Sequence, residues 1–277
     1  MVILWGFSVS SVAYGFKPDS LKTTVTGYVI GSYTKETGNF EIEKARMMLV
    51  ASYEKTTMKV EFDAVAQPVL VRALTCYQLP YGFSFTAGLQ PTDIIAFVPA
   101  PNNSLTALTT LAHLIPNFFD IGGSLKWKNS LINVSAGIFN GTGANKKDDN
   151  KAKDFISRLE LTPKNVIVGF TYQGGQQTKG SRTGCLINGQ WKPLSFLEIN
   201  SAYLKRNDLK QEGWFVNNLI NCSPKVQLVS QYLKGNRGEE LTLGFNLFPN
   251  KYNKVQFSWV FGKQIKPGLW LKLQQSF

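Results

Sequence analysis

Six basic residues lie in segments rich in apolar residues: Lys44, Arg46, Lys59, Arg72, Lys126 and Arg158. Residues two apart in a β-strand share a face, so these charges are expected on the polar faces of strands. Lysine ammonium groups along one wall raise the local concentration of anions. An arginine guanidinium matches the oxygens of phosphate with two parallel hydrogen bonds. The chemistry that these residues predict is therefore the attraction of anions.

Few residues could support other chemistry. His113 is the only histidine, and the three cysteines, Cys76, Cys185 and Cys222, are widely spaced with no CxxC motif. Zinc sites and histidine-dependent triads therefore have almost nothing to use. A Ser-His dyad at His113 is formally open, but the surrounding sequence, LTTLAHLIP, is apolar. We expect no enzymatic activity, no metal and no cofactor.

An amphipathic strand is the element that must position the charges. Every second residue is apolar from Leu241 to Leu247, and the alternation returns at Val255–Phe261 and Leu269–Leu273. Segments of roughly 9–11 residues with one apolar face are long enough to cross a bilayer as tilted strands. The chain has no run of about 18 apolar residues, as a transmembrane helix would need. The pattern predicts an all-β fold, a transmembrane antiparallel β-barrel.

About sixteen strands are expected, an even number as in bacterial barrels. Their predicted ranges are 22–33, 40–53, 57–65, 69–79, 82–90, 118–127, 130–140, 154–162, 165–174, 183–191, 195–206, 212–221, 225–234, 240–248, 254–262 and 268–277.

Every second connection between these strands is tight. The tight ones are Glu54–Thr56, Leu79–Gly82, Lys128–Asn129, Thr162–Asn165, Lys192–Leu194, Ser223–Pro224 and Pro249–Asn253. The other connections are generally longer, including the stretch after Gln90 and the segment Gly141–Lys153. Short periplasmic turns and longer extracellular loops are typical of an outer-membrane barrel. This phase also places both chain ends in the periplasm.

Aromatic residues mark the predicted loop end of the barrel. Tyr33, Tyr172, Tyr203 and Tyr232 each end a strand there in the outward phase. A ring of tyrosines at that level is expected at a membrane interface, although aromatic residues also favour strands in general. Phe277, the last residue, shares the face of Leu273 and resembles the terminal aromatic signal of bacterial outer-membrane proteins.

The N-terminal stretch differs from the rest of the chain. Residues 1–15, MVILWGFSVSSVAYG, are apolar and end in small residues. They resemble the later part of a secretory signal peptide, with cleavage after Ala13 or Gly15. A buried first strand is the alternative. Residues 16–277 are expected to form a single barrel.

Residues 25–162 resemble the phosphate-selective porin O/P family. The similarity lies in VTGYVIGSY, FEIEKARMMLVASYEKTTMKVEFDA, FSFTAGLQPTD, FDIGGSLKW, INVSAGIFNGTG and ISRLELTP, above all in GIFNGTG at Gly137–Gly143 and KAR at Lys44–Arg46. The resemblance implies a sixteen-stranded homotrimeric porin with a loop folded into the pore, for which residues 91–117 are the candidate. Phosphate-specific members line the pore with arginine, whereas this chain has 24 Lys and 6 Arg. Six arginines are few for such an arginine-lined pore.

Both signs of charge fall on the inward phase. Nine positive residues (Lys44, Arg46, Lys59, Arg72, Lys126, Arg158, Arg206, Lys254 and Lys272) face six negative ones (Glu61, Asp63, Asp120, Glu160, Glu198 and Glu240). This mild positive excess predicts passive diffusion of small hydrophilic solutes with modest anion preference. The first six positive residues are the candidates for pore lining and anion selectivity. Alternatively, Lys59, Glu61 and Asp63 pair across strands with Arg46 and Arg72 and stiffen the wall.

The net charge of +12 does not indicate nucleic-acid binding, because the lysines are scattered and no DNA- or RNA-binding motif is present. The expected partners are outer-membrane lipid, small anions and other hydrophilic solutes, and two further copies of the chain. A mitochondrial-type anion channel has similar length and basicity but an odd number of strands. A plugged outer-membrane barrel with a structural or adhesive role remains as the other alternative.

Overall fold

The computed structural model describes residues 21–34, 39–65, 70–92, 119–143, 152–177, 180–207, 210–236, 238–250, 252–262 and 268–276. These ranges hold sixteen strands and one short 3-10 turn, η1 (Pro80–Gly82). The strands are β1 (Lys22–Thr34), β2 (Asn39–Tyr53), β3 (Thr56–Asp63), β4 (Leu70–Gln78), β5 (Phe83–Pro91), β6 (Phe119–Lys128), β7 (Ile132–Phe139), β8 (Asp154–Leu161), β9 (Val166–Gln177), β10 (Gly180–Leu194), β11 (Leu197–Arg206), β12 (Gln211–Ser223), β13 (Val226–Gly235), β14 (Gly238–Asn250), β15 (Asn253–Gly262) and β16 (Gly268–Ser276).

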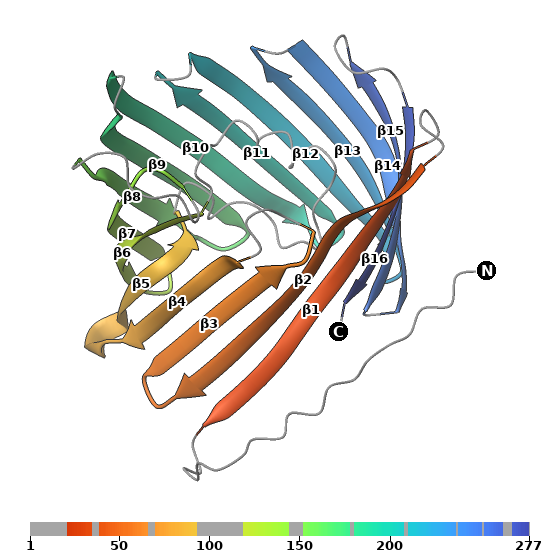
Figure 1. Ribbon diagram of the computed structural model, residues 1–277. Coiled ribbons are helices and arrows are strands. Elements are labelled where there is room, and N and C mark those ends of the chain that lie inside the picture. Colours follow the sequence, from red (N-terminus) through yellow and green to blue (C-terminus); the bar gives the residue numbers. More distant parts are fainter. Residues whose placement is uncertain are drawn as a thin grey trace.

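The sheet closes on itself. Each strand pairs with its neighbours in sequence, and β1 pairs antiparallel with β16 from Tyr28 opposite Ser276 to Thr34 opposite Trp270. Figure 1 shows the first and last strands side by side at this seam, with all strands running obliquely around one wall. Closure leaves no strand edge unpaired. The predicted barrel and its strand number are confirmed.

The two faces of the wall have opposite chemistry. Outward positions carry exposed apolar side chains such as Val134, Phe170 and Ile187, whereas inward positions carry buried polar ones such as Asn217 and Thr242. A soluble protein would show the reverse distribution. The arrangement suits a sheet whose outside meets hydrocarbon and whose inside is polar.

One predicted turn was wrong. The turn expected at Lys192–Leu194 lies at Ser195–Phe196, because β10 continues to Leu194 and begins at Gly180. The register between β10 and β11 shifts between Trp191 and Leu194. This irregularity accommodates Pro193, which has no backbone N–H to donate to the ladder.

Aromatic side chains gather at both ends of the outer face. At the loop end, Tyr172 is exposed, and the Trp214 and Tyr232 rings contact each other in a tilted arrangement with centroids 5.2 Å apart. At the turn end lie exposed Tyr53, Tyr77, Phe83, Trp191 and Tyr252, a second ring that the sequence analysis did not predict. Aromatic rings at two levels mark the two interfaces of a bilayer.

Several predictions fall outside the described residues: the signal-like segment 1–15, nearly all of segment 91–117 with His113, and Phe277. The backbone of Tyr33 lies in β1 as predicted, but its side chain is outside the description. Within the described ranges, no helix has the length and hydropathy to span a membrane.

The assignment of the two faces predicts that an added charge lowers the stability of the barrel more on the outer face than on the inner face. Ile187 lies mid-strand on the outer face of β10, 48% exposed, and Gln190 lies on the inner face of the same strand beside Glu198. Replacing Ile187 by Arg should lower the free energy of unfolding by about 2–4 kcal/mol, because arginine is costly at mid-membrane. Gln190→Arg should change it by less than about 1 kcal/mol. Urea unfolding in lipid vesicles measures both, and equal losses would contradict this assignment of faces.

Candidate functional site: the inner wall of the barrel

Ion pairs link neighbouring strands on the inner wall of β2–β4. In the register, Arg46 lies opposite Asp63, and Glu61 lies opposite Arg72. The Arg46 guanidinium contacts Asp63 Oδ2 at 2.9 Å and Glu61 Oε1 at 3.0 Å, and Arg72 Nε lies 3.3 Å from Glu61 Oε2. Alternating charge along β3 thus produces a cross-strand network. The prediction that Glu61 and Asp63 pair with Arg46 and Arg72 is confirmed.

Arg158 is held inside the wall. Its Nη1 donates to Thr171 Oγ1 at 2.9 Å and to Asn188 Oδ1 at 3.0 Å, and its Nη2 contacts Glu160 at 2.6 Å. Its side chain is only 3% exposed. A Cβ on Gly169 would come within 2.6 Å of Arg158 Nη2, so glycine makes room for the guanidinium. Arg158 therefore ties β8, β9 and β10 together and presents little charge to a solute.

A second buried network lies at the loop end and includes the GIFNGTG motif. Gly141 has φ of +84° and donates its N–H to Asp120 Oδ2 at 2.6 Å. The Gly141 carbonyl accepts a hydrogen bond from Arg182 Nη1 at 2.7 Å, and Arg182 contacts Asp154 Oδ2 at 2.6 Å. A side chain at Gly141 would collide with Asp154, and its positive φ also favours glycine. The motif is therefore a fixed connection on the inner wall.

Arg182 and Asp154 are inner-wall charges that were not predicted from the sequence. Arg182 precedes the predicted strand start at residue 183, and Asp154 is the first residue of β8. Leu186 and Gly184 face inward, and continuing this alternation toward the N-terminus by two residues would have placed Arg182 on the inner wall.

The six predicted selectivity residues are distributed over β2, β3, β4, β6 and β8 and do not form one cluster. The three arginines are in ion pairs. Lys59 is half-buried on the inner face between β2 and β4, and the described part of the chain offers it no ion pair. Lys44 and Lys126 are half-buried and have interaction partners.

Among the other inward charges, Arg206 and Lys254 are buried, and the Lys272 side chain is not described.

The wall formed by β11–β14 is mostly uncharged. Asn200 lies opposite Asn217, Asn217 opposite Gln231, and Gln231 opposite Thr242. The side-chain amides of Asn217 and Gln231 are buried without hydrogen-bond partners. The ion pairs of β2–β4 and β8–β10 thus contrast with the inner face of β11–β14, where amides are frequent and charged side chains are few.

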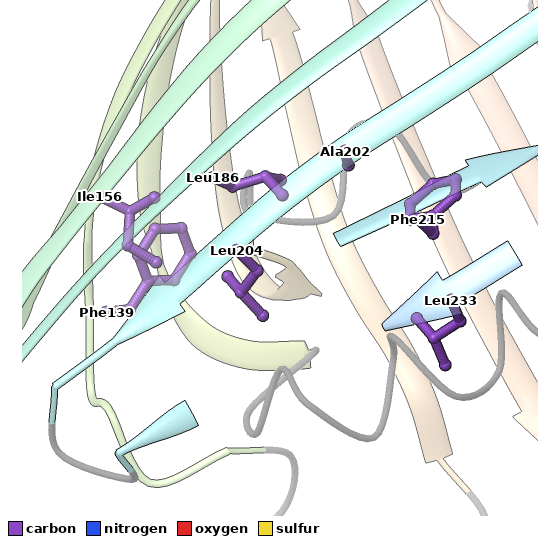
Figure 2. Packing of buried hydrophobic residues seen from close by; sticks show 7 residues of the cluster. All are labelled: Phe139, Ile156, Leu186, Ala202, Leu204, Phe215 and Leu233. Carbon is purple, nitrogen blue, oxygen red and sulfur yellow. The ribbon is translucent and has the colours of Figure 1, made fainter. Parts of the chain in front are cut away.

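An apolar cluster also faces inward, on strands β7 to β13 (Figure 2). Its members are Phe139, Ile156, Leu186, Ala202, Leu204, Phe215 and Leu233, each no more than 6% exposed. The alternating pattern predicted a polar inner face throughout and did not predict this cluster. The signal available in the sequence was the pair of inward leucines, Leu186 and Leu204, in the middle of polar faces.

Within the described ranges, no three His, Cys, Asp or Glu side chains lie close enough together to hold a metal ion. The inner wall carries charged groups, amides and an apolar surface. Such groups can interact with polar solutes without chemical reaction.

Comparisons with known proteins identify the class of fold. No family model and no curated protein sequence matches the chain. Among solved structures, the trimer form of OmpT, an outer membrane protein of Vibrio cholerae, is 13% identical, with 94% of this chain and 100% of that one covered and a TM-score of 0.71. OmpF of Salmonella typhi in complex with daunomycin gives 9% identity, coverage of 94% and 98%, and a TM-score of 0.69.

A triple mutant of the Rhodopseudomonas blastica porin is 9% identical to this chain. That match covers 92% of this chain and 100% of the porin, with a TM-score of 0.64. At such low identities the likeness shows the fold alone. The chain has the fold of a porin-like outer-membrane β-barrel.

The buried network predicts a large effect of removing one charge. Arg182→Gln leaves Asp154 buried without its ion pair and should lower the free energy of unfolding by about 3–5 kcal/mol. The matched control Lys192→Gln removes an exposed partner of Glu198 and should cost less than about 1 kcal/mol. Urea unfolding of folded protein in detergent gives both values. Equal losses in the free energy of unfolding for the two variants would mean that the buried network does not stabilise the barrel.

Proposed function

We propose that the chain is a bacterial outer-membrane porin that forms a water-filled channel for passive diffusion of small hydrophilic solutes. The observation that carries this proposal is the closed sixteen-stranded barrel with an apolar outer face and a polar, charged inner face. Barrels of this strand number leave an aqueous channel. The OmpT trimer among the similar structures supports a homotrimer.

We further propose that the channel has a modest preference for anions. Each described arginine of β2–β8 is paired with an acid, so these arginines contribute little net field. The lysines therefore supply the positive excess, and Lys59, with no ion pair in the described ranges, is the strongest candidate. Phosphate is one candidate solute, on the basis of the resemblance to phosphate-selective porins.

For residues 91–117 we propose a constriction that reaches into the barrel. The segment leaves β5 after Pro91 and returns at β6 with Phe119. Thr92, next to Pro91, is buried. The buried apolar cluster on β7–β13 gives an apolar segment a surface to pack on, whereas bare apolar side chains in a water-filled lumen would be unfavourable.

The same burial favours a second candidate, a plugged barrel with a structural or adhesive role. Inner-wall residues such as Asn217 and Asn246 have no exposed surface, which a filled lumen would also produce.

Single-channel current in a planar bilayer separates the two candidates. We expect stepwise conductance with a reversal potential on the chloride side in a potassium chloride gradient, because a positive inner-wall charge such as that of Lys59 favours anions. Addition of phosphate then tests for block. A correctly folded barrel without conductance would overturn the porin proposal in favour of the plugged barrel.

A charge reversal tests the anion preference. Lys59→Glu should lower the chloride-to-potassium permeability ratio by about twofold or more, because it replaces an inner-wall cation by an anion. Lys164→Glu makes the same charge change at an exposed turn residue and should leave the ratio nearly unchanged. Reversal potentials in the same salt gradient measure both. Similar shifts in the two variants would mean that Lys59 does not set selectivity.

A further inference from the structure

A basic hollow of about 500 Å³ lies at the loop end, between the β11–β12 and β13–β14 connections. Three lysines, Lys205, Lys210 and Lys234, and the buried Arg206 line it, against one acidic residue, Glu212. Within the described ranges Lys205 and Lys210 form no ion pair; Lys205 lies opposite Glu212 in the register, where the Glu212 carboxylate accepts a hydrogen bond from the Tyr203 hydroxyl. Lys234 contacts Glu239 at 3.0 Å, but both side chains are about half exposed, and such pairs are weak.

The frame of the hollow is fixed by Asn236. Its Oδ1 accepts a hydrogen bond from the Glu212 N–H at 2.9 Å, and its Nδ2 donates to the Lys210 carbonyl. Asn207 joins the same rim to β10 through Thr183 at 2.8 Å. These bonds hold the two connections together, so the basic side chains project from a defined backbone.

Several side chains that line the hollow, among them Lys205, Trp214 and Lys234, have the outward phase of their strands. Lys205 lies two residues beyond Tyr203 on the outward face of β11, and Lys234 lies two residues beyond Tyr232 on the outward face of β13. Two residues along a strand span roughly 7 Å. Lys205 and Lys234 therefore lie just beyond the belt of aromatic residues at the membrane interface, at the level of the lipid head groups.

We propose that this hollow binds the phosphorylated head group of a lipid in the outer leaflet. The excess of cations suits a phosphate group, and Trp214, which also lines the hollow, gives an apolar flank toward the acyl chains. A free anion would lack that second contact, because the site is continuous with the lipid-facing surface. The proposal rests on the membrane placement that the proposed porin function implies.

Native mass spectrometry of the detergent-purified protein with diphosphoryl lipid A tests the proposal. The triple variant Lys205→Gln/Lys210→Gln/Lys234→Gln should bind this lipid about tenfold more weakly than the unmodified protein, or worse. A control variant, Lys128→Gln/Lys164→Gln/Lys225→Gln, removes the same charge from exposed turn-end residues and should bind within about twofold of the unmodified protein. With dephosphorylated lipid A, all three proteins should bind alike.

Three results would overturn the proposal: equal binding of lipid A by the two triple variants, the same defect with dephosphorylated lipid, or displacement of lipid A by equimolar inorganic phosphate. The last result would assign the hollow to free phosphate. Conductance of the same variants separates this proposal from the porin function, because neutralising the outer rim should leave the channel open. Loss of lipid binding with intact conductance is the expected combination.

Discussion

Every peptide group of a membrane-spanning strand must find its hydrogen-bond partner within the sheet, because hydrocarbon offers none. The first and last strands each have only one neighbour in sequence, so each would leave one edge unpaired. The pairing of β1 with β16 satisfies the peptide groups at these edges. Three of the register shifts, at Trp191/Leu194, Asn221/Ser223 and Leu247/Asn250, lie at the turn end of their strands. At that end water can complete the hydrogen bonds; the other two shifts lie at Ile30/Gly31 within β1 and at Glu61/Phe62 toward the loop end of β3.

Closure also explains the chemistry of the inner wall. Inward side chains from adjacent strands lie close together, so a charge on one strand needs a partner on the next. Arg46 meets Asp63 and Glu61 in this way, and Arg158 reaches both Thr171 and Asn188. Arginine suits these places because its planar group can bond to several strands at once. Most arginine charge within the described ranges is therefore used in holding the wall together.

The sequence predicted the parts of the structure that depend on period 2 alone. These include the number of strands, the inward phase of Lys59 and Arg72, and the ends at which turns and loops lie. It did not predict the burial of Arg158 or the pairing of Arg182 with Asp154, because those depend on the register between strands and on contacts between residues 28 positions apart. The apolar inner cluster was missed for a related reason. Its members come from many strands, and none of those strands alone departs far from alternation.

The network around Gly141 bears on how the barrel is completed. Asp120 and Asp154 belong to β6 and β8, whereas Arg182, the ion-pair partner of Asp154, belongs to β10. A sheet that lacked β10 would hold two carboxylates near each other at the loop end without that cation. Electrostatics would then oppose any intermediate that stops at β9 and favour those that include the next hairpin. The region β6–β10 should for this reason assemble as one cooperative unit.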